Sequence, residues 1–364
     1  MKVFQVFVPN PVFYRDFDSR NPSRGDTSYQ ERLRSLIDEY FMSPHVLLPA
    51  LRDEDEFFFA YANDEKLCEL WASENGLGEC NHYDVLRDQI KQFKPDVLYI
   101  MHPFIHGPDF VKTIRQYVGK VVCWHAGPHV KGDFSCFDIM LSNFPPHLNH
   151  WKSQGIRGEF FCPAVDSKMK ASAKEEREYD LVFVGNLGGV HHKKRTSLVS
   201  DLVKSLGDDY KISICGGGPR WKPLFKNGRF LSRIPSLIPA LPRHLTRVTQ
   251  PPVFGQRLYE LFGNSKLCLN VAGNTSLDYR VNMRCFEAMG SGACMLSDSG
   301  RYLEHFRPKT DFETYDCAAS LIDSVHQLLK SPDRLRDLAS SGFDMVHKHY
   351  SKELQWDLFK KICS

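Results

Sequence analysis

The pattern of apolar and polar positions along this chain predicts strands that are separated by helices. Short apolar runs without alternation are typical of parallel strands that are buried on both faces. In the first half such runs predict strands at residues 3–8, 57–61, 96–101, 120–124, 137–142 and 158–162. Amphipathic segments predict helices at residues 29–41, 84–93, 109–117 and 146–154, and a proline-containing polar loop precedes the first of them.

The second half repeats this alternation after a polar, charged segment at residues 166–178, which we interpret as a linker. Strands are predicted at residues 179–185, 210–215, 266–271 and 293–296, and helices at 196–206, 255–262, 318–329, 332–349 and 352–363. Strands that alternate with helices predict an α/β protein with two doubly wound domains. We place these domains at residues 1–165 and 179–350, followed by a C-terminal helix at 351–364.

Composition narrows the class of protein without identifying it. The chain has 364 residues, 42% of them apolar and 25% charged, with a net charge of +3, which is too mild to imply a nucleic-acid partner. Eleven cysteines include no Cys-x-x-Cys pair, so we expect reduced thiols rather than disulfides or a zinc site. No apolar run is long enough to span a bilayer, and the start of the chain lacks a signal-peptide pattern. We therefore expect a cytoplasmic protein, or one at the cytoplasmic membrane face.

One segment departs from the average charge. Residues 211–259 contain nine Lys or Arg and no Asp or Glu, and six prolines interrupt residues 223–252. The segment reads as a basic, partly irregular insertion. It is either a solvated loop or a contact for an anionic membrane surface, a nucleic acid or a phosphorylated acceptor.

The most informative stretch is a short predicted helix that carries Arg280, Arg284 and Glu287 along one face, because their spacings are four and three. Gly290 and Gly292 then end the helix. Two cations and a carboxylate on one face suit a ligand that has both phosphates and sugar hydroxyls. The alternative is that Arg284 and Glu287 only pair with each other.

Three glycine-containing loops follow predicted strands, where ligands bind in open α/β sheets. Glycines allow backbone amides to approach an anion, and basic residues at the start of a helix strengthen such a site. The loops match neither a Rossmann fingerprint nor a P-loop. The candidate residues in them are Gly185, Asn186, Lys194 and Arg195, then Gly216 and Gly217, then Gly273, Asn274, Asp278 and Tyr279. Residues 297–299, after the last of these strands, are further candidates for contact with the ligand.

In the first half, His102 and His125 follow predicted strands and would face the cleft between the domains. Histidine titrates near neutrality and can take a proton from a hydroxyl group, so His125 is the candidate base. A structural role for either histidine is the alternative. Residues 53–55 (Asp-Glu-Asp) have the form of a metal-binding triplet, which we interpret as a solvated face.

The second half resembles the C-terminal domain of group 1 glycosyltransferases of GT-B architecture, closest to the spore-maturation CgeB-like branch. The matching segments are 179–185 with Arg195, then Arg-Cys-Phe-Glu-Ala-Met-Gly-Ser-Gly-Ala at 284–293, and the tail from Tyr302 to Gly342. The first half matches only in layout.

This resemblance implies an enzyme with two Rossmann-like domains facing a cleft and a C-terminal helix that crosses back to the first domain. The N-terminal domain would bind the acceptor and the C-terminal domain the nucleotide sugar. Glu287 would hold the ribose hydroxyls, residues 273–279 would contact the diphosphate and the sugar, and Arg195 with Lys194 would neutralise the diphosphate. The family's second glutamate is replaced by Tyr279, with Asp278 as its candidate substitute.

We therefore expect a cytoplasmic glycosyltransferase of glycan biosynthesis. It would transfer a sugar from a nucleoside-diphosphate sugar to a hydroxyl group of a glycan, lipid-linked glycan, protein or nucleic acid. Fixed cations and helix N-terminal amides can stabilise the leaving diphosphate, so neither a metal ion nor a cofactor is expected. The alternatives are an epimerase or hydrolase of nucleotide sugars, and a non-catalytic module that binds nucleotide sugars or nucleic acid through residues 211–259.

Overall fold

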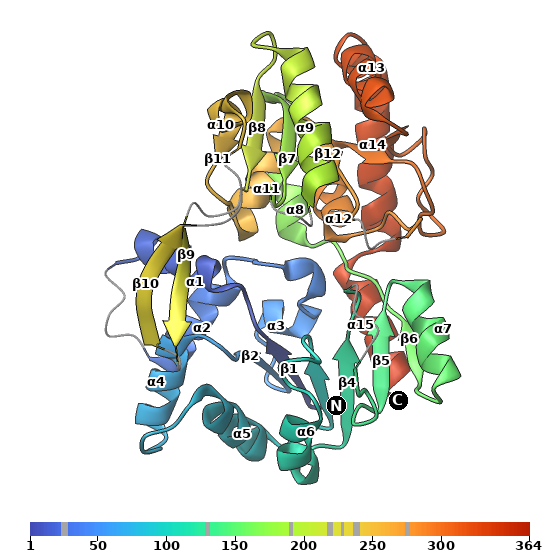
Figure 1. Cartoon of the computed structure of the whole chain (residues 1–364). Coiled ribbons are helices and arrows are strands. Elements are labelled where there is room, and N and C mark those ends of the chain that lie inside the picture. Colours follow the sequence, from blue (N-terminus) through green and yellow to red (C-terminus); the bar gives the residue numbers. More distant parts are fainter. Residues whose placement is uncertain are drawn as a thin grey trace. The chain divides into compact units, whose positions relative to one another are not determined.

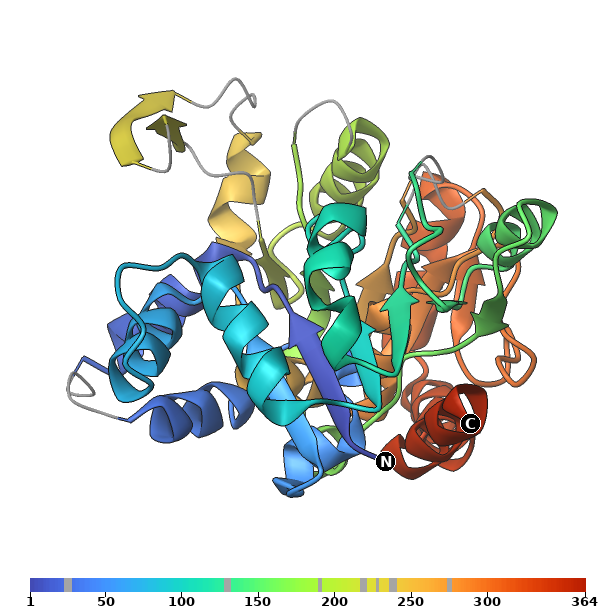
Figure 2. The ribbon, with the colours of Figure 1, turned by 90° about the horizontal axis from the view of Figure 1, so that it is seen from below.

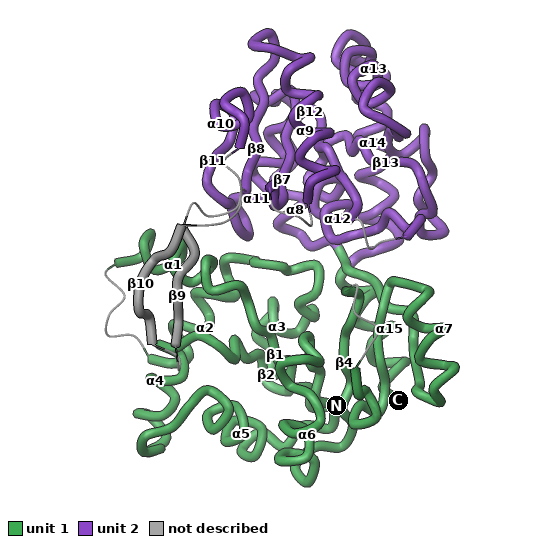
Figure 3. Tube along the Cα trace, in the orientation of Figure 1, with its two compact units in different colours: residues 1–164, 352–364 green, residues 165–351 purple. Residues whose placement is uncertain are grey.

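The chain folds into two compact units, which we describe one by one (Figure 3). Unit 1 contains residues 1–164 and 352–364, and unit 2 contains residues 165–351. The computed structural model describes residues 1–22, 28–127, 132–188, 192–216, 221–226, 229–235, 241–273 and 277–364, with the backbone alone for 221–226 and 229–235.

Unit 1 is built on a six-stranded parallel sheet in the order β2-β1-β3-β4-β5-β6. Its strands are β1 (Val3–Phe7), β2 (Phe57–Tyr61), β3 (Val97–Ile100), β4 (Lys120–Trp124), β5 (Ile139–Ser142) and β6 (Gly158–Phe160). Helices connect the strands (Figure 1): α1 (Pro11–Arg20), α2 (Tyr29–Ile37), α3 (Leu48–Arg52), α4 (Glu65–Glu74), α5 (His82–Phe93), α6 (Pro108–Ile114) and α7 (Pro145–Ser153).

Unit 2 contains a second six-stranded parallel sheet, in the order β11-β8-β7-β12-β13-β14. Its strands are β7 (Tyr179–Val184), β8 (Ile212–Cys215), β11 (Thr249–Gln250), β12 (Ser265–Asn270), β13 (Cys294–Asp298) and β14 (Glu313–Tyr315). Its helices are α8 (Ser167–Ser172), α9 (Lys193–Leu206), α10 (Arg243–Val248), α11 (Gly255–Gly263), α12 (Met283–Gly290), α13 (Ala318–Leu329) and α14 (Pro332–His349).

Each sheet carries its own hydrophobic core, as unbroken apolar strands require. In unit 1, Phe4, Leu98 and Val121 from three neighbouring strands pack with helix residues such as Ile90 and Trp151. In unit 2, residues of β7, β12 and β13 pack against α9, α13 and α14. The covering helices of both sheets can be followed in Figure 2. The predicted α/β fold with two doubly wound sheets is confirmed.

The C-terminal helix α15 (Lys352–Cys363) packs on unit 1, although the preceding helix α14 belongs to unit 2. Lys352 is buried, and its Nζ donates to the carbonyl oxygens of Ser43 at 2.5 Å and Val46 at 2.7 Å. Gln355 Nε2 donates to the carbonyl oxygens of Pro44 and Cys162. These buried hydrogen bonds hold the helix on the N-terminal sheet, so the predicted return of the chain is confirmed.

The structure corrects several local predictions. Residues 11–20 form helix α1 instead of a loop, because Pro11 is the first helical residue and the Asn10 side chain accepts a hydrogen bond from Val12 N. The segment predicted as a linker contains α8, which Asp166 caps. Within the basic insertion, β9 (Trp221–Lys226) and β10 (Arg229–Pro235) form an antiparallel hairpin, and α10 follows. Within the described residues, no helix is both long and apolar enough to cross a bilayer.

Candidate functional site

A cavity of about 680 Å³ lies at the carboxyl ends of strands β12, β13 and β14 in unit 2, and we call it the carboxyl-end pocket. The first turns of the helices α9 and α13 border it, and the positive end of a helix dipole makes such an edge favourable for an anion. It is lined by Lys194, Arg195, Ser197, Leu198, Asp201, Val271, Ala272, Gly273, Leu277, Arg280, Asp298, Ser299, Tyr315, Asp316, Cys317 and Ala318.

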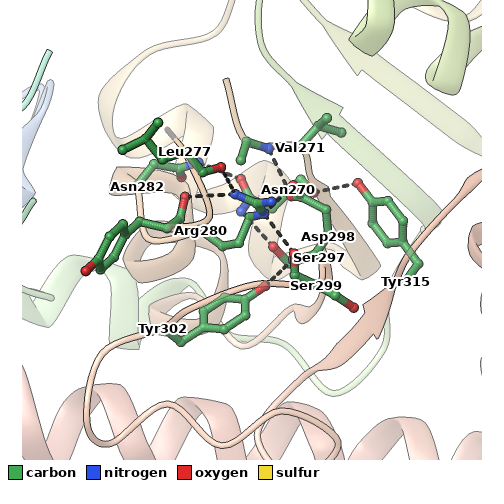
Figure 4. A network of polar contacts seen from close by, with 12 residues as sticks. Asn270, Val271, Leu277, Arg280, Asn282, Ser297, Asp298, Ser299, Tyr302 and Tyr315 are labelled. Atoms are coloured by element: carbon green, nitrogen blue, oxygen red, sulfur yellow. Dashed lines mark hydrogen bonds and ion pairs between the residues drawn. The ribbon is translucent and has the colours of Figure 1, made fainter. Parts of the chain in front are cut away.

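Arg280 and Asp298 organise this pocket (Figure 4). Arg280 Nε lies 2.7 Å from Asp298 Oδ2 and donates to the Ser299 carbonyl, while Nη1 donates to the Leu277 carbonyl at 2.7 Å. Asp298 Oδ1 accepts the backbone N–H of Ala272 at 3.0 Å. The ion pair therefore connects the loop after β12 with the end of β13.

Amide and hydroxyl side chains hold these loops in place through hydrogen bonds. Asn270 Nδ2 donates to Ser297 Oγ at 3.0 Å, and Asn282 Nδ2 donates to Asn270 Oδ1 at 2.9 Å (Figure 4). Tyr315 Oη donates to the Asn270 carbonyl. Buried polar groups that are all paired hold a site rigid.

Arg195 lines this pocket and has no carboxylate partner within the described part of the chain. Its Nη2 donates to the Val271 carbonyl at 3.0 Å, and Nη1 lies 3.4 Å from the Asn186 carbonyl. Its Nε is buried with no partner among the described residues. Burial lowers the pKa of the guanidinium group. A partly buried charge of this kind gains from an anionic ligand. Lys194 beside it is exposed and also lines the pocket.

Arg284 and Glu287 form an ion pair on helix α12, as the structural alternative supposed. Glu287 is only 1% exposed, and burial raises the pKa of its carboxyl group while Arg284 opposes that rise. Arg284 Nε lies 3.4 Å from the Val184 carbonyl at the end of β7, so the pair is directed toward the glycine loop there. Among the described residues, neither lines the carboxyl-end pocket itself.

Arg280 is not part of the helix that carries this pair, which corrects the prediction of a single face with three charges. Helix α12 begins at Met283, because the Asn282 side chain accepts a hydrogen bond from Arg284 N and caps the helix. Arg280 lies in the preceding loop and reaches the pocket from there.

The glycine loops of β7 and β8 lie against each other. A Cβ on Gly216, whose φ is +121°, would approach the Gly185 carbonyl oxygen to 2.4 Å. A Cβ on Gly185 would lie 3.7 Å from Arg195 Nη1. Gly216 is therefore required for the two loops to approach each other, whereas a Cβ at position 185 would be in ordinary contact with the arginine. The predicted residues Gly217 and Asn274 lie outside the described residues.

Asp278 and Tyr279 lie on an outer rim. The Asp278 carboxylate is 2.7 Å from Arg301 Nε in an exposed ion pair, and the Arg301 guanidinium lies 5.8 Å from the centre of the Tyr279 ring. Gly273 lines the pocket, but Asp278 and Tyr279 are outside its described lining.

The corresponding edge of unit 1 is aromatic. His125 follows β4, and its ring stacks on His147 with the ring centres 5.2 Å apart. Phe104 and Phe134 lie against the same ring at 5.3 and 6.0 Å. His147 Nε2 lies 2.6 Å from the Gly127 carbonyl oxygen. His125 is thus held in one orientation by flat neighbours.

The other histidine and acidic candidates of unit 1 are placed as follows. Burial lowers the pKa of His102, and its Nε2 has no partner among the described residues. Residues 53–55 are exposed at the end of α3, in agreement with a solvated face. In the described part of the chain, no three His, Cys, Asp or Glu side chains are grouped as metal ligands.

Sequence reasoning missed Tyr315, Asp316 and Cys317 in the pocket lining, because β14 is a strand of only three residues. Two features of the sequence could have indicated this strand: the alternating residues Glu-Thr-Tyr, and the helix start that follows them. At that helix start the Ser320 hydroxyl accepts a hydrogen bond from the N–H of Cys317. By contrast, residues 298 and 299, which follow a predicted strand, do line the pocket.

Residues 195–358 match the model of a family described as glycosyl transferase-like, and this stretch covers most of unit 2 and the first part of α15. A search of curated proteins by sequence found no match.

Solved structures with the same fold cover the whole chain. Alr3699/HepE of Anabaena in complex with UDP and glucose has a TM-score of 0.57 and 10% identity over 100% of this chain and 99% of its own. The DNA modifying enzyme β-glucosyltransferase, solved with and without its substrate uridine diphosphoglucose, has a TM-score of 0.55 and 15% identity over 100% of both chains. TarM has a TM-score of 0.55 and 10% identity over 79% of this chain, which spans 59% of the length of TarM. The chain has the GT-B fold of these glycosyltransferases.

Proposed function

We propose that this protein is a metal-independent glycosyltransferase that transfers a sugar from a nucleoside-diphosphate sugar to a hydroxyl acceptor. The observation that carries this proposal is the carboxyl-end pocket. There Arg195, partly buried and without a carboxylate partner among the described residues, lies in the first turn of α9, and the start of α13 lines the same pocket. Such an arrangement favours a ligand with more than one negative charge, as a diphosphate has.

The charges of the pocket fit the chemistry of glycosyl transfer. The acceptor oxygen bonds to the anomeric carbon, the bond from that carbon to the diphosphate oxygen breaks, and negative charge builds on the departing diphosphate. Arg195 and Lys194 are proposed to stabilise that charge, together with the first amide groups of α9. The close approach of Gly185 and Gly216 would let backbone groups near Asn186 reach the same ligand, and Gly217, which lies outside the described residues, is a further candidate.

Glu287 is proposed to bind the ribose hydroxyls of the donor, with Arg284 holding its carboxylate in place. A buried carboxylate with one arginine partner among the described residues has lone pairs left for hydroxyl donors. Gly273 and Asn274 would contact the diphosphate, and Asp278 with Tyr279 the sugar. His125 is proposed as the base that accepts the proton of the acceptor hydroxyl, because its neighbours fix its ring at the carboxyl end of β4.

We further propose that the donor is a uridine nucleotide, since structures of the same fold were solved with UDP-glucose or with UDP and glucose. The motif at residues 284–293 supports membership of the CgeB-like branch. A cytoplasmic site of action, with contact to an anionic membrane or another polyanion through residues 211–259, completes the proposal. The side chains of residues 217–240 lie outside those described.

The proposal is tested by calorimetric titration of UDP and UDP-glucose into wild-type protein and Glu287→Gln. Removing the charged acceptor of ribose hydroxyls should weaken UDP binding about tenfold to a hundredfold. Glu313→Gln is the matched control, because Glu313 is also a buried carboxylate in unit 2, paired with Lys309 and Arg334. The control should lose stability and keep its UDP affinity. Equal UDP affinity in Glu287→Gln and wild type would reject the ribose assignment.

The pH dependence of UDP binding gives a second measurement. Since burial raises the Glu287 pKa above its ordinary value of 4.5, acidification should protonate this carboxyl group, and weaken binding, before ordinary glutamates titrate. Glu287→Gln should lack this loss. Release of glucose from UDP-glucose at the full enzymatic rate without any acceptor would instead favour a hydrolase, and UDP-glucose binding without turnover on any acceptor would favour a binding module.

A further inference from the structure

Unit 2 has a second cavity at the opposite edge of its sheet, which we call the amino-end pocket. It measures about 610 Å³ and lies where strands β7, β12 and β13 begin. Lys266 is the second residue of β12, Gly292 lies two residues before β13, and Arg177 lies two residues before β7. The carboxyl-end pocket lies at the far ends of the same parallel strands, so the two pockets are separate.

One wall of the amino-end pocket is basic. Lys174, Arg177 and Lys266 line it, Arg336 lines the pocket from α14, and Glu175 is the acidic residue in the described lining. Lys266 lies 2.7 Å from Asp180, and Arg336 lies 3.1 Å from Asp333, so these two cations are already neutralised.

Arg177 is different, because no carboxylate among the described residues neutralises it. Its Nε donates to the Lys174 carbonyl at 3.1 Å, and Nη1 donates to the Ser265 carbonyl at 3.3 Å. Gly292, with φ of +86°, lies beside it, and a Cβ there would be 3.0 Å from the Ala173 Cβ and 3.5 Å from Arg177 Nη2. Burial lowers the pKa of this guanidinium group, as expected for a cation that lacks a counter-charge. A half-buried cation without a carboxylate partner is suited to bind an anion.

The facing wall is apolar. Leu329 at the end of α13, and Leu335, Ala339 and Phe343 along α14, line it. Leu335 and Phe343 are eight residues apart on one helix, so they lie about two turns from each other along the same side. A cavity with a cationic wall and an apolar wall can satisfy both parts of an amphiphilic molecule.

We propose that the amino-end pocket is a second ligand site for an organic anion, that is, a carboxylate, phosphate or sulfonate group on a compact apolar body. The anionic group lies against Arg177, and the apolar body lies along α14. Inorganic phosphate lacks the apolar part, and a neutral alcohol lacks the charge, so neither fills both walls.

The probe is 8-anilinonaphthalene-1-sulfonate, a sulfonate on an aromatic body, titrated by its fluorescence into the full chain. Arg177→Met should weaken its binding about tenfold or more, because one charge-assisted contact is lost. Ser340→Glu adds a negative charge to the exposed lining residue Ser340, removes no described hydrogen bond, and should weaken binding as much. Arg247→Met is the matched control, since Arg247 is an exposed arginine of unit 2 paired with Asp208, and it should bind the probe as the wild type does.

Competition separates the two parts of the ligand. Decanoate should displace the probe, whereas decanol and inorganic phosphate at the same concentration should not. All variants should keep their UDP affinity, because the carboxyl-end pocket is untouched, and this also shows that they are folded. Wild-type probe affinity in both Arg177→Met and Ser340→Glu, or displacement by decanol as effective as that by decanoate, would overturn the proposal.

Discussion

The carboxyl ends of the strands in the two parallel sheets are followed by side chains of different chemistry. In unit 1, the residues after β3 and β4 are aromatic rings and histidines, with Phe104, His125 and Phe134 packed together. In unit 2, the residues after β12 and β13 are charged or amide groups in a connected network around Arg280 and Asp298. The same architecture thus presents a largely uncharged surface in one unit and a fixed electrostatic one in the other.

This difference supports the proposal that the two edges have separate roles. A rigid network of charges is preorganised for an ion and needs little rearrangement when charge develops. A surface of flat rings suits the uncharged part of a substrate, and a histidine side chain can accept a proton from a hydroxyl group. The proposed division between diphosphate binding in unit 2 and hydroxyl activation in unit 1 follows from this contrast, and the variants below test it in order of expected effect.

The largest effect is expected for His125→Gln, which keeps a polar side chain and removes the base. Loss of a general base should lower kcat about 10²- to 10⁴-fold, while UDP-glucose affinity stays unchanged because unit 2 is intact. His150→Gln, on helix α7 of the same unit, is the control and should turn over normally. Steady-state kinetics and calorimetry measure the two quantities. Near-normal turnover of His125→Gln would show that His125 is not the base and would reject the proposed role of unit 1 in activating the hydroxyl group.

Arg280→Met should disrupt the network of charged and amide groups at the carboxyl-end pocket of unit 2. The substitution leaves Asp298 without its partner and removes hydrogen bonds to the Leu277 and Ser299 carbonyls, so unit 2 should lose about 2–4 kcal/mol of stability. UDP affinity should fall as well, since Arg280 lines the pocket.

The matched variant in unit 1 is Arg115→Met, because Arg115 pairs with Asp138 at 2.7 Å on an exposed surface. Exposed pairs contribute under about 1 kcal/mol, so urea denaturation should barely change. Equal losses in Arg280→Met and Arg115→Met would show that the unit 2 network is no more important for stability than a surface ion pair.

The sequence predicted the sheets better than the site. Strands such as residues 57–61 and 120–124 have the predicted bounds, because a buried apolar run has few alternatives in a parallel sheet. Helix α1 was missed because Pro11 was interpreted as a loop residue, although proline is favoured at the first helical position.

The site depends on distances that spacing alone does not encode. The spacing of Arg284 and Glu287 predicted their contact, but not that Glu287 is buried, because burial depends on how α12 packs in unit 2. The pairing of Arg280 with Asp298 joins residues 18 apart in sequence, through a loop and a strand whose geometry only the fold defines.

Buried histidines should make the stability of unit 1 depend on pH. Burial lowers the pKa of His106 from 6.5 to about 4, and its ring, only 1% exposed, packs on Phe110 and Tyr83. The unfolded chain then binds a proton more readily than the folded one, so stability is lost as the pH falls from 6.5 toward 4. The shift corresponds to about 3 kcal/mol when complete.

His106→Phe keeps an aromatic ring and cannot be protonated, so urea denaturation at pH 7 and pH 4.5 should show a smaller difference than in wild type. His326→Phe in unit 2 is the comparison, because His326 packs on Tyr210 and its Nδ1 is hydrogen bonded to the Tyr210 hydroxyl group at 3.1 Å. An unchanged pH dependence in His106→Phe would show that this histidine does not contribute to acid sensitivity.

The smallest effect is expected for a variant of Asp278, which tests whether this residue of unit 2 contacts the sugar or the nucleotide of the donor. Asp278 pairs with Arg301 on the exposed rim, so Asp278→Asn should cost under about 1 kcal/mol of stability. If its carboxylate contacts the sugar, UDP-glucose binding should weaken severalfold through the loss of about 1 kcal/mol, while UDP binding stays the same. Arg301→Gln breaks the same ion pair and keeps the carboxylate, so it should bind both ligands as the wild type does. Parallel losses for UDP and UDP-glucose in Asp278→Asn would place this residue with the nucleotide instead, and the rim would then extend the diphosphate site rather than form a separate surface for the sugar.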